Sequence, residues 1–151
     1  MGFKVTINNS SIKFSACHFL KEPKKCSRLH GHNYYVSVEI CNDLDDNNFV
    51  IDFLELREKL EEIVAPLDHY ILIPMESRNV EINEEQDSIE ILTSGKRYVF
   101  PRSDVKFLPL PATSSEQLAK YIHDKLKEIY DTRKICVKIE ESKGNISSYS
   151  E

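Results

Sequence analysis

The chain has 151 residues, 40% of them hydrophobic and 30% charged, a composition typical of one soluble globular domain. Its formal net charge of −5 argues against a nucleic-acid partner, and no apolar run approaches the roughly 20 residues of a membrane-spanning helix. The four cysteines form no C-x-x-C spacing and no signal-peptide pattern is present, so we expect reduced thiols in the cytoplasm.

The first third of the chain predicts strands on either side of a basic loop. Residues 3–7, 12–18 and 32–41 alternate between apolar and polar side chains and are rich in strand-forming types. A turn is expected at residues 8–11. Residues 19–29 are expected to form a loop that contains Pro23 and a basic cluster of Lys24, Lys25 and Arg28.

Two helices are predicted, each from a start signal and an apolar stripe at helical spacing. Asp52 is a good N-cap with Glu55 three residues later, and Thr113 with Glu116 repeats that capping-box pattern. Pro66 ends the first helix. The expected buried stripes are Phe53, Leu56, Leu60 and Ile63 or Val64 in the first helix, and Leu118, Ile122, Leu126 and Ile129 in the second.

The remaining predicted elements are strands. Residues 80–83, 89–92 and 97–100 are expected to be short strands, with a hairpin turn at residues 93–96, and residues 134–141 the last strand. Two helices among several antiparallel strands predict an α+β fold, in a single domain over residues 1–151.

Three of the five histidines fall within fifteen residues, at His18, His30 and His32. Side chains at i and i+2 of a strand share one face, so His30 and His32 converge if the strand already begins at His30. An antiparallel return through residues 19–29 would bring His18 beside them. Three imidazoles with one open position are typical of a catalytic zinc, so we predict a Zn²⁺ site at these histidines.

Cys26 lies four residues before His30 in the basic loop. Positive neighbours and a nearby dication favour a thiolate, which can act as a base, a nucleophile or a metal ligand. Cys26 is therefore either a fourth zinc ligand or a proton-transfer group beside the metal, and the sequence does not separate these two roles.

Two further positions carry candidate chemistry. Asp68 precedes His69 at a predicted helix exit, and an aspartate can orient a histidine for proton transfer, although neighbours in sequence rarely pair without a turn. Glu141 is in phase with Val137 and Ile139 on the last strand, so its carboxylate needs a partner or the edge of a site.

Together these motifs resemble the 6-pyruvoyl-tetrahydropterin synthase / 6-carboxytetrahydropterin synthase family. The resemblance spans almost the whole chain and keeps the family's order of motifs. They are Phe14-Ser15-Ala16-Cys17-His18, Cys26-x-x-x-His30-Gly31-His32-Asn33-Tyr34, Asp52-Phe53, Leu67-Asp68-His69, Thr113-Ser114-Ser115-Glu116, and Glu141 with Tyr149.

The resemblance implies the tunnelling fold (T-fold), in which two helices lie on one face of a four-stranded antiparallel sheet. It also implies trimeric barrels that pair into a homo-hexamer, with active sites at subunit interfaces. Residues from about 76 to 108 exceed what shorter members of the family need, so we expect an inserted hairpin there.

The resemblance further implies a role for each site residue. The metal ligands would be His18, His30 and His32, and the catalytic residues Cys26, Asp68 and His69. Glu141 would anchor the pterin by accepting hydrogen bonds from its 2-amino group and ring N–H. Ser114 and Ser115 stand where the family has pterin-contacting threonines, although helix capping also explains them.

The implied activity is that of a zinc-dependent lyase acting on 7,8-dihydroneopterin triphosphate. The three-residue gap between Cys26 and His30 resembles 6-carboxytetrahydropterin synthases, which release acetaldehyde and triphosphate on the route to queuosine-type deazapurine nucleosides. Animal 6-pyruvoyl-tetrahydropterin synthases have a longer gap. A third branch cleaves the side chain to 6-hydroxymethyl-dihydropterin and has a glutamate near the cysteine position, where Glu22 is available. A zinc-containing pterin-binding module without catalysis is the non-enzymatic alternative.

Overall fold

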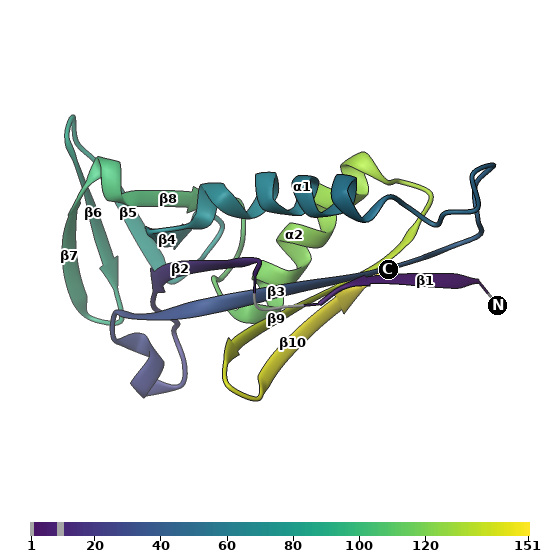
Figure 1. Cartoon of the computed structure of the whole chain (residues 1–151). Coiled ribbons are helices and arrows are strands. Elements are labelled where there is room, and N and C mark those ends of the chain that lie inside the picture. The colour runs from purple at the N-terminus through teal and green to yellow at the C-terminus, as the bar shows by residue number, and fades with distance from the viewer. Residues whose placement is uncertain (1, 9–10) are drawn as a thin grey trace.

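The structure, a computed structural model, describes residues 2–8 and 11–151. A seven-stranded sheet forms its centre, with the strand order β10-β9-β3-β2-β4-β8 and β1 paired with β3 (Figure 1). Of the turn predicted at residues 8–11, residues 9 and 10 lie outside the described part. The strands are β1 (Phe3–Ile7), β2 (Lys13–His18), β3 (His30–Asn42), β4 (Tyr70–Pro74), β8 (Val105–Leu108), β9 (Lys134–Ser142) and β10 (Asn145–Ser150).

The α+β prediction is confirmed, and the sheet is larger than the four antiparallel strands expected. Strands β10, β9, β3 and β2 pair antiparallel, whereas β4 pairs parallel with both β2 and β8. Strands β4, β8 and β10 were not predicted from the sequence. β4 and β8 are only five and four residues long, too short for a clear alternation of side chains.

Both helices, α1 (Phe53–Val64) and α2 (Ser115–Ile129), cover the same face of the sheet (Figure 1). Their fully buried residues pack on inward-facing residues of β3 and β9 in one core. Phe53 and Ile129 of the predicted stripes are exposed, because they lie at helix ends beyond the sheet contact. The buried set is Leu56, Leu60, Val64, Leu118, Ile122, Leu126, Val36, Val38, Ile40, Val137 and Ile139.

The N-cap residue of α1 is the one predicted from the sequence, whereas the N-cap residue of α2 is not. Asp52 caps α1 by accepting hydrogen bonds from the amides of residues 54 and 55. Glu55 turns away from that cap and accepts a hydrogen bond from the hydroxyl of Tyr130. The cap of α2 is Ser114 rather than Thr113, because the helix begins one residue later and Ser114 accepts from the amide of residue 117.

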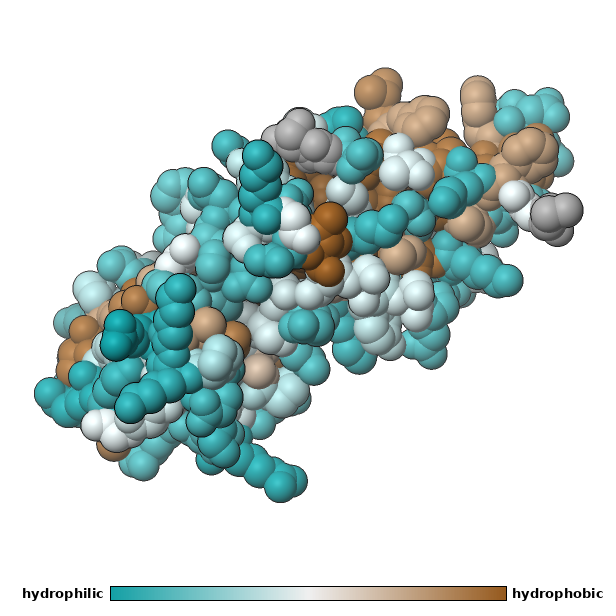
Figure 2. Space-filling view, turned by 90° about the horizontal axis from the view of Figure 1, so that it is seen from below, coloured by the Kyte–Doolittle hydropathy of each residue, from teal (hydrophilic) through white to brown (hydrophobic). Residues whose placement is uncertain are grey.

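The face of the sheet away from the helices is largely hydrophilic (Figure 2). Ser37, Glu39 and Lys138 point there, opposite the buried residues of the same strands, and Lys138 donates to Glu39. A polar outer face over an apolar inner face is usual for antiparallel sheets. No helix within residues 2–8 and 11–151 is long and apolar enough to cross a membrane.

A second, three-stranded antiparallel sheet lies at one end of the molecule (Figure 1). Its strands β5 (Val80–Glu84), β6 (Ser88–Thr93) and β7 (Lys96–Pro101) match the three short strands predicted there. The β6–β7 turn has positive φ angles at Ser94 and Gly95, which matches the right-handed twist of a two-residue hairpin. A separate core joins this sheet to β4 and β8 and includes Phe19, Ile73, Ile89 and Ile91.

Candidate metal centre and adjoining cavities

The pairing of β2 with β3 brings the three histidines together. β3 begins at His30, and His18 lies directly opposite it across the ladder. His30 and His32 continue the inward-facing series of Tyr34, because alternate residues of a strand share one face. The ring centroids are 4.6 Å apart for His18 and His30, 5.0 Å for His30 and His32, and 5.3 Å for His18 and His32.

Glu141 completes this cluster from β9, on the other side of β3. One ligand atom from each histidine and one from Glu141 lie within 4.8 Å of one another. The Oε1 atom of Glu141 is 2.8 Å from Nε2 of His32 and 3.7 Å from Nε2 of His18. Four donor atoms at such spacing can surround one divalent cation, because zinc accepts imidazole nitrogens and carboxylate oxygens at about 2 Å.

Main-chain carbonyls orient two of the histidines. Nδ1 of His18 is 2.8 Å from the carbonyl oxygen of Thr113, and Nδ1 of His30 is 2.6 Å from that of Arg28. A carbonyl oxygen can only accept, so Nδ1 carries a proton in both rings, and in the neutral form of each ring Nε2 keeps the lone pair. This is the usual outer-shell arrangement of metal-binding histidines.

The electrostatics of the cluster favour the neutral imidazole at His18 and at His32. Burial lowers the pKa of His18 to about 4, against a raising effect of its bond to Thr113, and the pKa of His32 is also lowered by burial. Nε2 of His32 is buried and makes no hydrogen bond to any described residue, although Glu141 is close. A neutral ring whose buried nitrogen faces a carboxylate oxygen without a hydrogen bond to it suits coordination of a shared cation, so the residues fit a metal ion.

Gly31 allows β2 and β3 to approach closely between the two histidines of β3. A Cβ atom at this position would lie 3.1 Å from the carbonyl oxygen of Ala16, closer than most real Cβ contacts. A larger residue would therefore press on the ladder that aligns His18 with His30.

Cys26 lies in a short 3₁₀ helix, Lys24–Ser27, within the loop predicted at residues 19–29. It lines a cavity of about 860 Å³ together with His30, His32 and Glu141, and Lys25 is on the same wall. Cys26 is not part of the four-residue cluster, whose fourth donor is Glu141. The two roles expected for Cys26, zinc ligand and proton-transfer group, both stay predictions.

Asp68 and His69 pair directly, contrary to the usual behaviour of sequence neighbours. His69 has φ +64°, and this turn brings its Nδ1 to 2.7 Å from Oδ2 of Asp68. The amide of Ser15 donates to Oδ1 of Asp68, and this bond is the main reason that the pKa of Asp68 is lowered. The pair is therefore fixed to β2, the strand that ends at His18.

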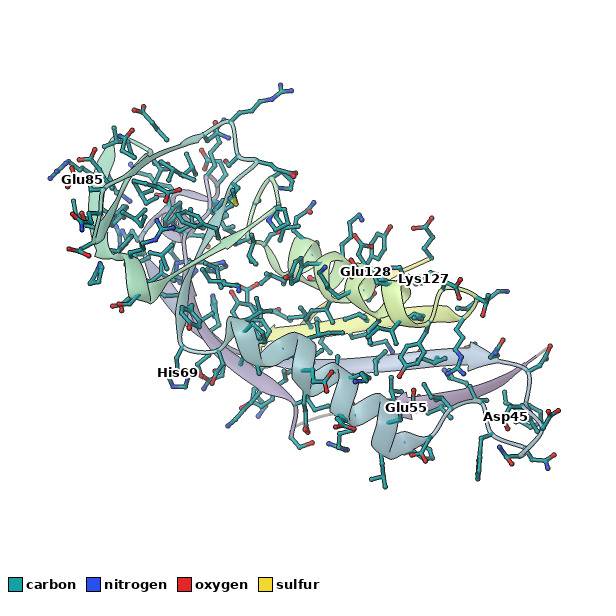
Figure 3. The ribbon with its side chains drawn as sticks, turned by 90° about the horizontal axis from the view of Figure 1, so that it is seen from above. Asp45, Glu55, His69, Glu85, Lys127 and Glu128 are labelled. Carbon is teal, nitrogen blue, oxygen red and sulfur yellow. The ribbon has the colours of Figure 1, made fainter. Side chains whose placement is uncertain are left out.

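The Asp68–His69 pair does not face Cys26 within one chain. His69 lines a different cavity, of about 460 Å³, with Cys17 and Tyr70, and His32 borders both cavities. Figure 3 shows the side chain of His69 at the periphery, beyond the end of α1. Within one chain, Cys26 and His69 therefore line separate cavities.

The two serines at the start of α2, the N-cap Ser114 and the first helical residue Ser115, differ in their surroundings. Ser114 caps the helix, whereas Ser115 lines the larger cavity and its Oγ is 2.6 Å from Oγ of Ser147.

Sequence reasoning overlooked the carbonyl of Thr113, which orients His18, since a main-chain role leaves no signal in residue type. It also overlooked the buried hydroxyl of Tyr34, 3.3 Å from both ring nitrogens of His18.

Comparison with known proteins gives a consistent picture. The family model described as 6-pyruvoyl tetrahydropterin synthase matches residues 7–151. A protein of Methanocaldococcus jannaschii, provisionally named a 6-carboxy-5,6,7,8-tetrahydropterin synthase, is 32% identical over 80% of this chain and 77% of its own. The Haemophilus influenzae protein with that name is 26% identical over 99% of both chains.

A solved structure is similar over the full length. It is a Plasmodium vivax 6-pyruvoyltetrahydropterin synthase described as a catalytic-residue mutant, in which a glutamate is replaced by alanine. Its TM-score is 0.91 at 26% sequence identity, and the match covers 100% of this chain and 98% of that one.

Proposed function

Because the chain belongs to the 6-pyruvoyl tetrahydropterin synthase family, we propose that it converts 7,8-dihydroneopterin triphosphate to 6-carboxy-5,6,7,8-tetrahydropterin. Acetaldehyde and triphosphate are the other products, and the reaction belongs to a queuosine-type deazapurine route. The observation that carries this proposal is the His18, His30, His32 and Glu141 cluster, which shares one cavity with Cys26. The names of the M. jannaschii and H. influenzae relatives favour the 6-carboxy product.

We assign Zn²⁺ to the cluster, with His18, His30 and His32 as ligands. Neutral imidazoles and an adjacent carboxylate match the donor types that zinc takes in catalytic sites. Bound zinc supplies a Lewis acid that polarises the hydroxyl groups of the substrate side chain.

The proton-transfer residues in this proposal are Cys26, Asp68 and His69. The Cys26 thiol exchanges a proton with the substrate on the cavity side that it lines. Asp68 holds His69 in one tautomer by accepting from its Nδ1, so that Nε2 can exchange a proton on the opposite face. Since His69 borders the other cavity, we propose that it serves the site of a neighbouring subunit in a homo-hexamer.

We propose that Glu141 and Ser115 contact the pterin. We propose that the basic loop contacts the triphosphate. A carboxylate can accept from the 2-amino group and the ring N–H together. Ser115, Lys25 and Arg28 line the same cavity as Glu141. Positive side chains at its rim would attract a triphosphate.

Two other products and a non-catalytic role are alternatives. The P. vivax relative has a glutamate that is described as catalytic, and Glu22 is exposed in the loop that holds Cys26. That similarity keeps 6-pyruvoyl-tetrahydropterin and 6-hydroxymethyl-dihydropterin as alternatives. Because Cys26 lines the cavity and Asp68 is paired with His69, we favour an enzyme over a pterin-binding module.

The deciding experiment is to incubate zinc-loaded protein with 7,8-dihydroneopterin triphosphate and to identify the products by mass. We expect 6-carboxy-5,6,7,8-tetrahydropterin with acetaldehyde and triphosphate, and no turnover by His30→Ala. Another pterin as the main product would move the chain to that branch, and binding without product would make it a binding module.

The metal assignment has its own measurement. Elemental analysis of protein purified without chelators should find about one zinc per chain, as one four-donor cluster predicts. His123→Ala is the control that matches His30→Ala, because His123 is a buried histidine outside the cluster. This change should leave the zinc content unchanged. A protein without divalent metal, even after reconstitution, would contradict the assignment.

A further inference from the structure

The small sheet β5-β6-β7 packs against both ends of the loop that carries Cys26. Phe19, at the start of the loop, stacks on Tyr98 of β7 with ring centroids 5.8 Å apart and an interplanar angle of 5°. Leu29, at its end, packs into the same second core as Tyr98 and Phe100. The loop and this sheet lie at the same end of the molecule (Figure 1).

Within the loop, the backbone of Cys26 is held at both of its polar groups. Its amide donates to the carbonyl of Pro23, and its carbonyl accepts from the amide of Leu20, each at 2.8 Å. Next to it, the hydroxyl of Ser27 donates to the carbonyl of Lys24. The carbonyl of Ser27 lies at the C-terminal end of the 3₁₀ helix, where carbonyls lack a partner within the helix.

Lys96 of the small sheet supplies that partner. Its Nζ donates to the carbonyl oxygen of Ser27 at 2.9 Å and lies 3.3 Å from the Ser27 hydroxyl. Lys96 is the first residue of β7, directly after the tight turn at Ser94 and Gly95, so its position is set by a short hairpin. A cation near the C-terminus of a helical turn is also electrostatically favourable.

We propose that Lys96 is a positioning residue for Cys26, and that the β5-β6-β7 sheet serves to hold the Cys26 loop against the metal-containing cavity. This inference rests on the proposed function, because Cys26 is the group whose placement matters. It gives a role to the segment from about 76 to 108, which the sequence marked only as an insertion. Lys96 acts through Ser27 and need not touch the substrate.

The expected effect follows from the geometry of proton transfer. A misplacement of about 1 Å can lower a catalysed rate about a hundredfold. We therefore expect Lys96→Met, which keeps the aliphatic length but removes the donor, to lower kcat about tenfold to a hundredfold with little change in KM. Zinc content should be unchanged, because the contact lies outside the metal cluster.

The experiment measures kcat, KM, zinc content and the rate at which iodoacetamide alkylates Cys26, located by peptide mapping of the zinc-loaded protein. A freer loop should make alkylation of Cys26 faster in Lys96→Met, at temperatures where the variant is fully folded. Lys96→Arg keeps a cationic donor and should restore part of kcat. If Lys96→Met does not fold, Lys96→Gln, which retains a shorter donor, takes its place.

The matched control is Arg97→Met, the adjacent position of the same strand with the same loss of charge. The Arg97 side chain is exposed and pairs with Glu90 inside the small sheet, so its loss should leave both kcat and Cys26 alkylation unchanged. Cys26→Ala is measured in parallel.

Unchanged alkylation of Cys26 in Lys96→Met would overturn the proposal whatever happens to turnover. Faster alkylation with wild-type kcat would overturn it too if Cys26→Ala is inactive. If Cys26→Ala itself turns over at the wild-type rate, the catalytic role of Cys26 in the proposed function fails, and faster alkylation would still support the contact between Lys96 and the loop.

Discussion

Glu141 shows how one side chain can serve either the metal or the substrate. Its Oε1 lies close to Nε2 of both His18 and His32, yet the family resemblance implies a role as the pterin anchor. A carboxylate at this position can turn toward a pterin when the substrate enters, provided that three histidines suffice for the metal.

We predict that Glu141→Gln weakens pterin binding and leaves the zinc content unchanged. Losing a charge-assisted hydrogen bond costs about 1.5–3 kcal/mol, which is roughly tenfold or more in affinity. Calorimetric titration with the pterin and elemental analysis measure the two effects. Glu140→Gln, the neighbour that bonds the amide of Gly144, is the control. Loss of zinc in Glu141→Gln would make Glu141 a ligand, and unchanged pterin affinity would leave it a structural residue.

Cys26 is the residue for which the chemical roles differ most. We predict that Cys26→Ala lowers product formation at least about a hundredfold, the usual scale of a proton-transfer group, with zinc retained. Turnover and zinc content measured on the same preparation separate the roles, with Cys136→Ala on β9 as the control thiol. A parallel fall in zinc would indicate a ligand, and near-wild-type turnover would remove Cys26 from the mechanism.

The Asp68 carboxyl group should make the stability of the folded chain depend on pH, because its pKa is lowered by contacts in the site. The amide of Ser15 and the ring of His69 keep its pKa in the folded chain below the ordinary value. A carboxyl group with a lowered folded pKa contributes stability above its unfolded pKa of about 3.9, and this contribution is lost as the pH falls through the folded value.

We therefore predict that Asp68→Asn unfolds at lower denaturant concentration than wild type at neutral pH, and that this difference shrinks as the pH falls below about 4. Denaturant titrations at a series of pH values measure it, with Asp46→Asn in the exposed 43–49 loop as the control. A difference that is constant with pH would show that the Asp68 carboxylate does not contribute in this way.

At the level of elements, the metal centre lies where the core face of the sheet meets the start of α2. The inward-facing residues of β3 lead from Val38 and Val36 through Tyr34 to His32, and those of β9 lead through Ile139 to Glu141. The segment directly before α2 contributes the carbonyl of Thr113, which orients His18. The same packing that buries the helices therefore also desolvates His18 and His32, which lowers the pKa of both and favours their neutral form.

The two serines at the start of α2 should separate helix capping from substrate binding. We predict that Ser114→Ala lowers the free energy of unfolding by about 1 kcal/mol, as the loss of an N-cap does, without changing pterin affinity. Ser115→Ala should weaken pterin binding by about 0.5–1.5 kcal/mol, as for one neutral hydrogen bond. Denaturant unfolding and pterin titration of both variants test this, and weaker pterin binding in Ser114→Ala would contradict it.

At the scale of the whole molecule, three strands of the seven-stranded sheet pair on one side only within the described chain, namely β1, β8 and β10. Open edges of this kind are ready to pair with another chain. The separate cavities of Cys26 and His69 also fit a site shared between subunits.

We predict a homo-hexamer, or at least a trimer, at micromolar concentration. Light scattering measures the mass directly, and mixing Cys26→Ala with His69→Ala chains tests for shared sites. Mixed oligomers should regain activity, because one interface then holds an intact Cys26 and an intact His69. A monomer that is fully active would contradict both the assembly and the shared site.

The sequence by itself determined the α+β class, the two helices and most strands, because alternation and helical periodicity are local properties. It also located the histidine cluster, since i and i+2 positions of a strand share a face and His18 needed only an antiparallel return. The hairpin turn before Lys96 and the cap at Asp52 were equally local.

Only the tertiary structure decided which distant groups meet. It brought Glu141 beside His32 and the carbonyl of Thr113 beside His18, and these contacts depend on strand order and helix placement. It joined Lys96 to Ser27, 69 positions apart in the chain. Side-chain periodicity carries no information about pairing between elements, so the short strands β4 and β8 and these long-range contacts could not be read from the sequence.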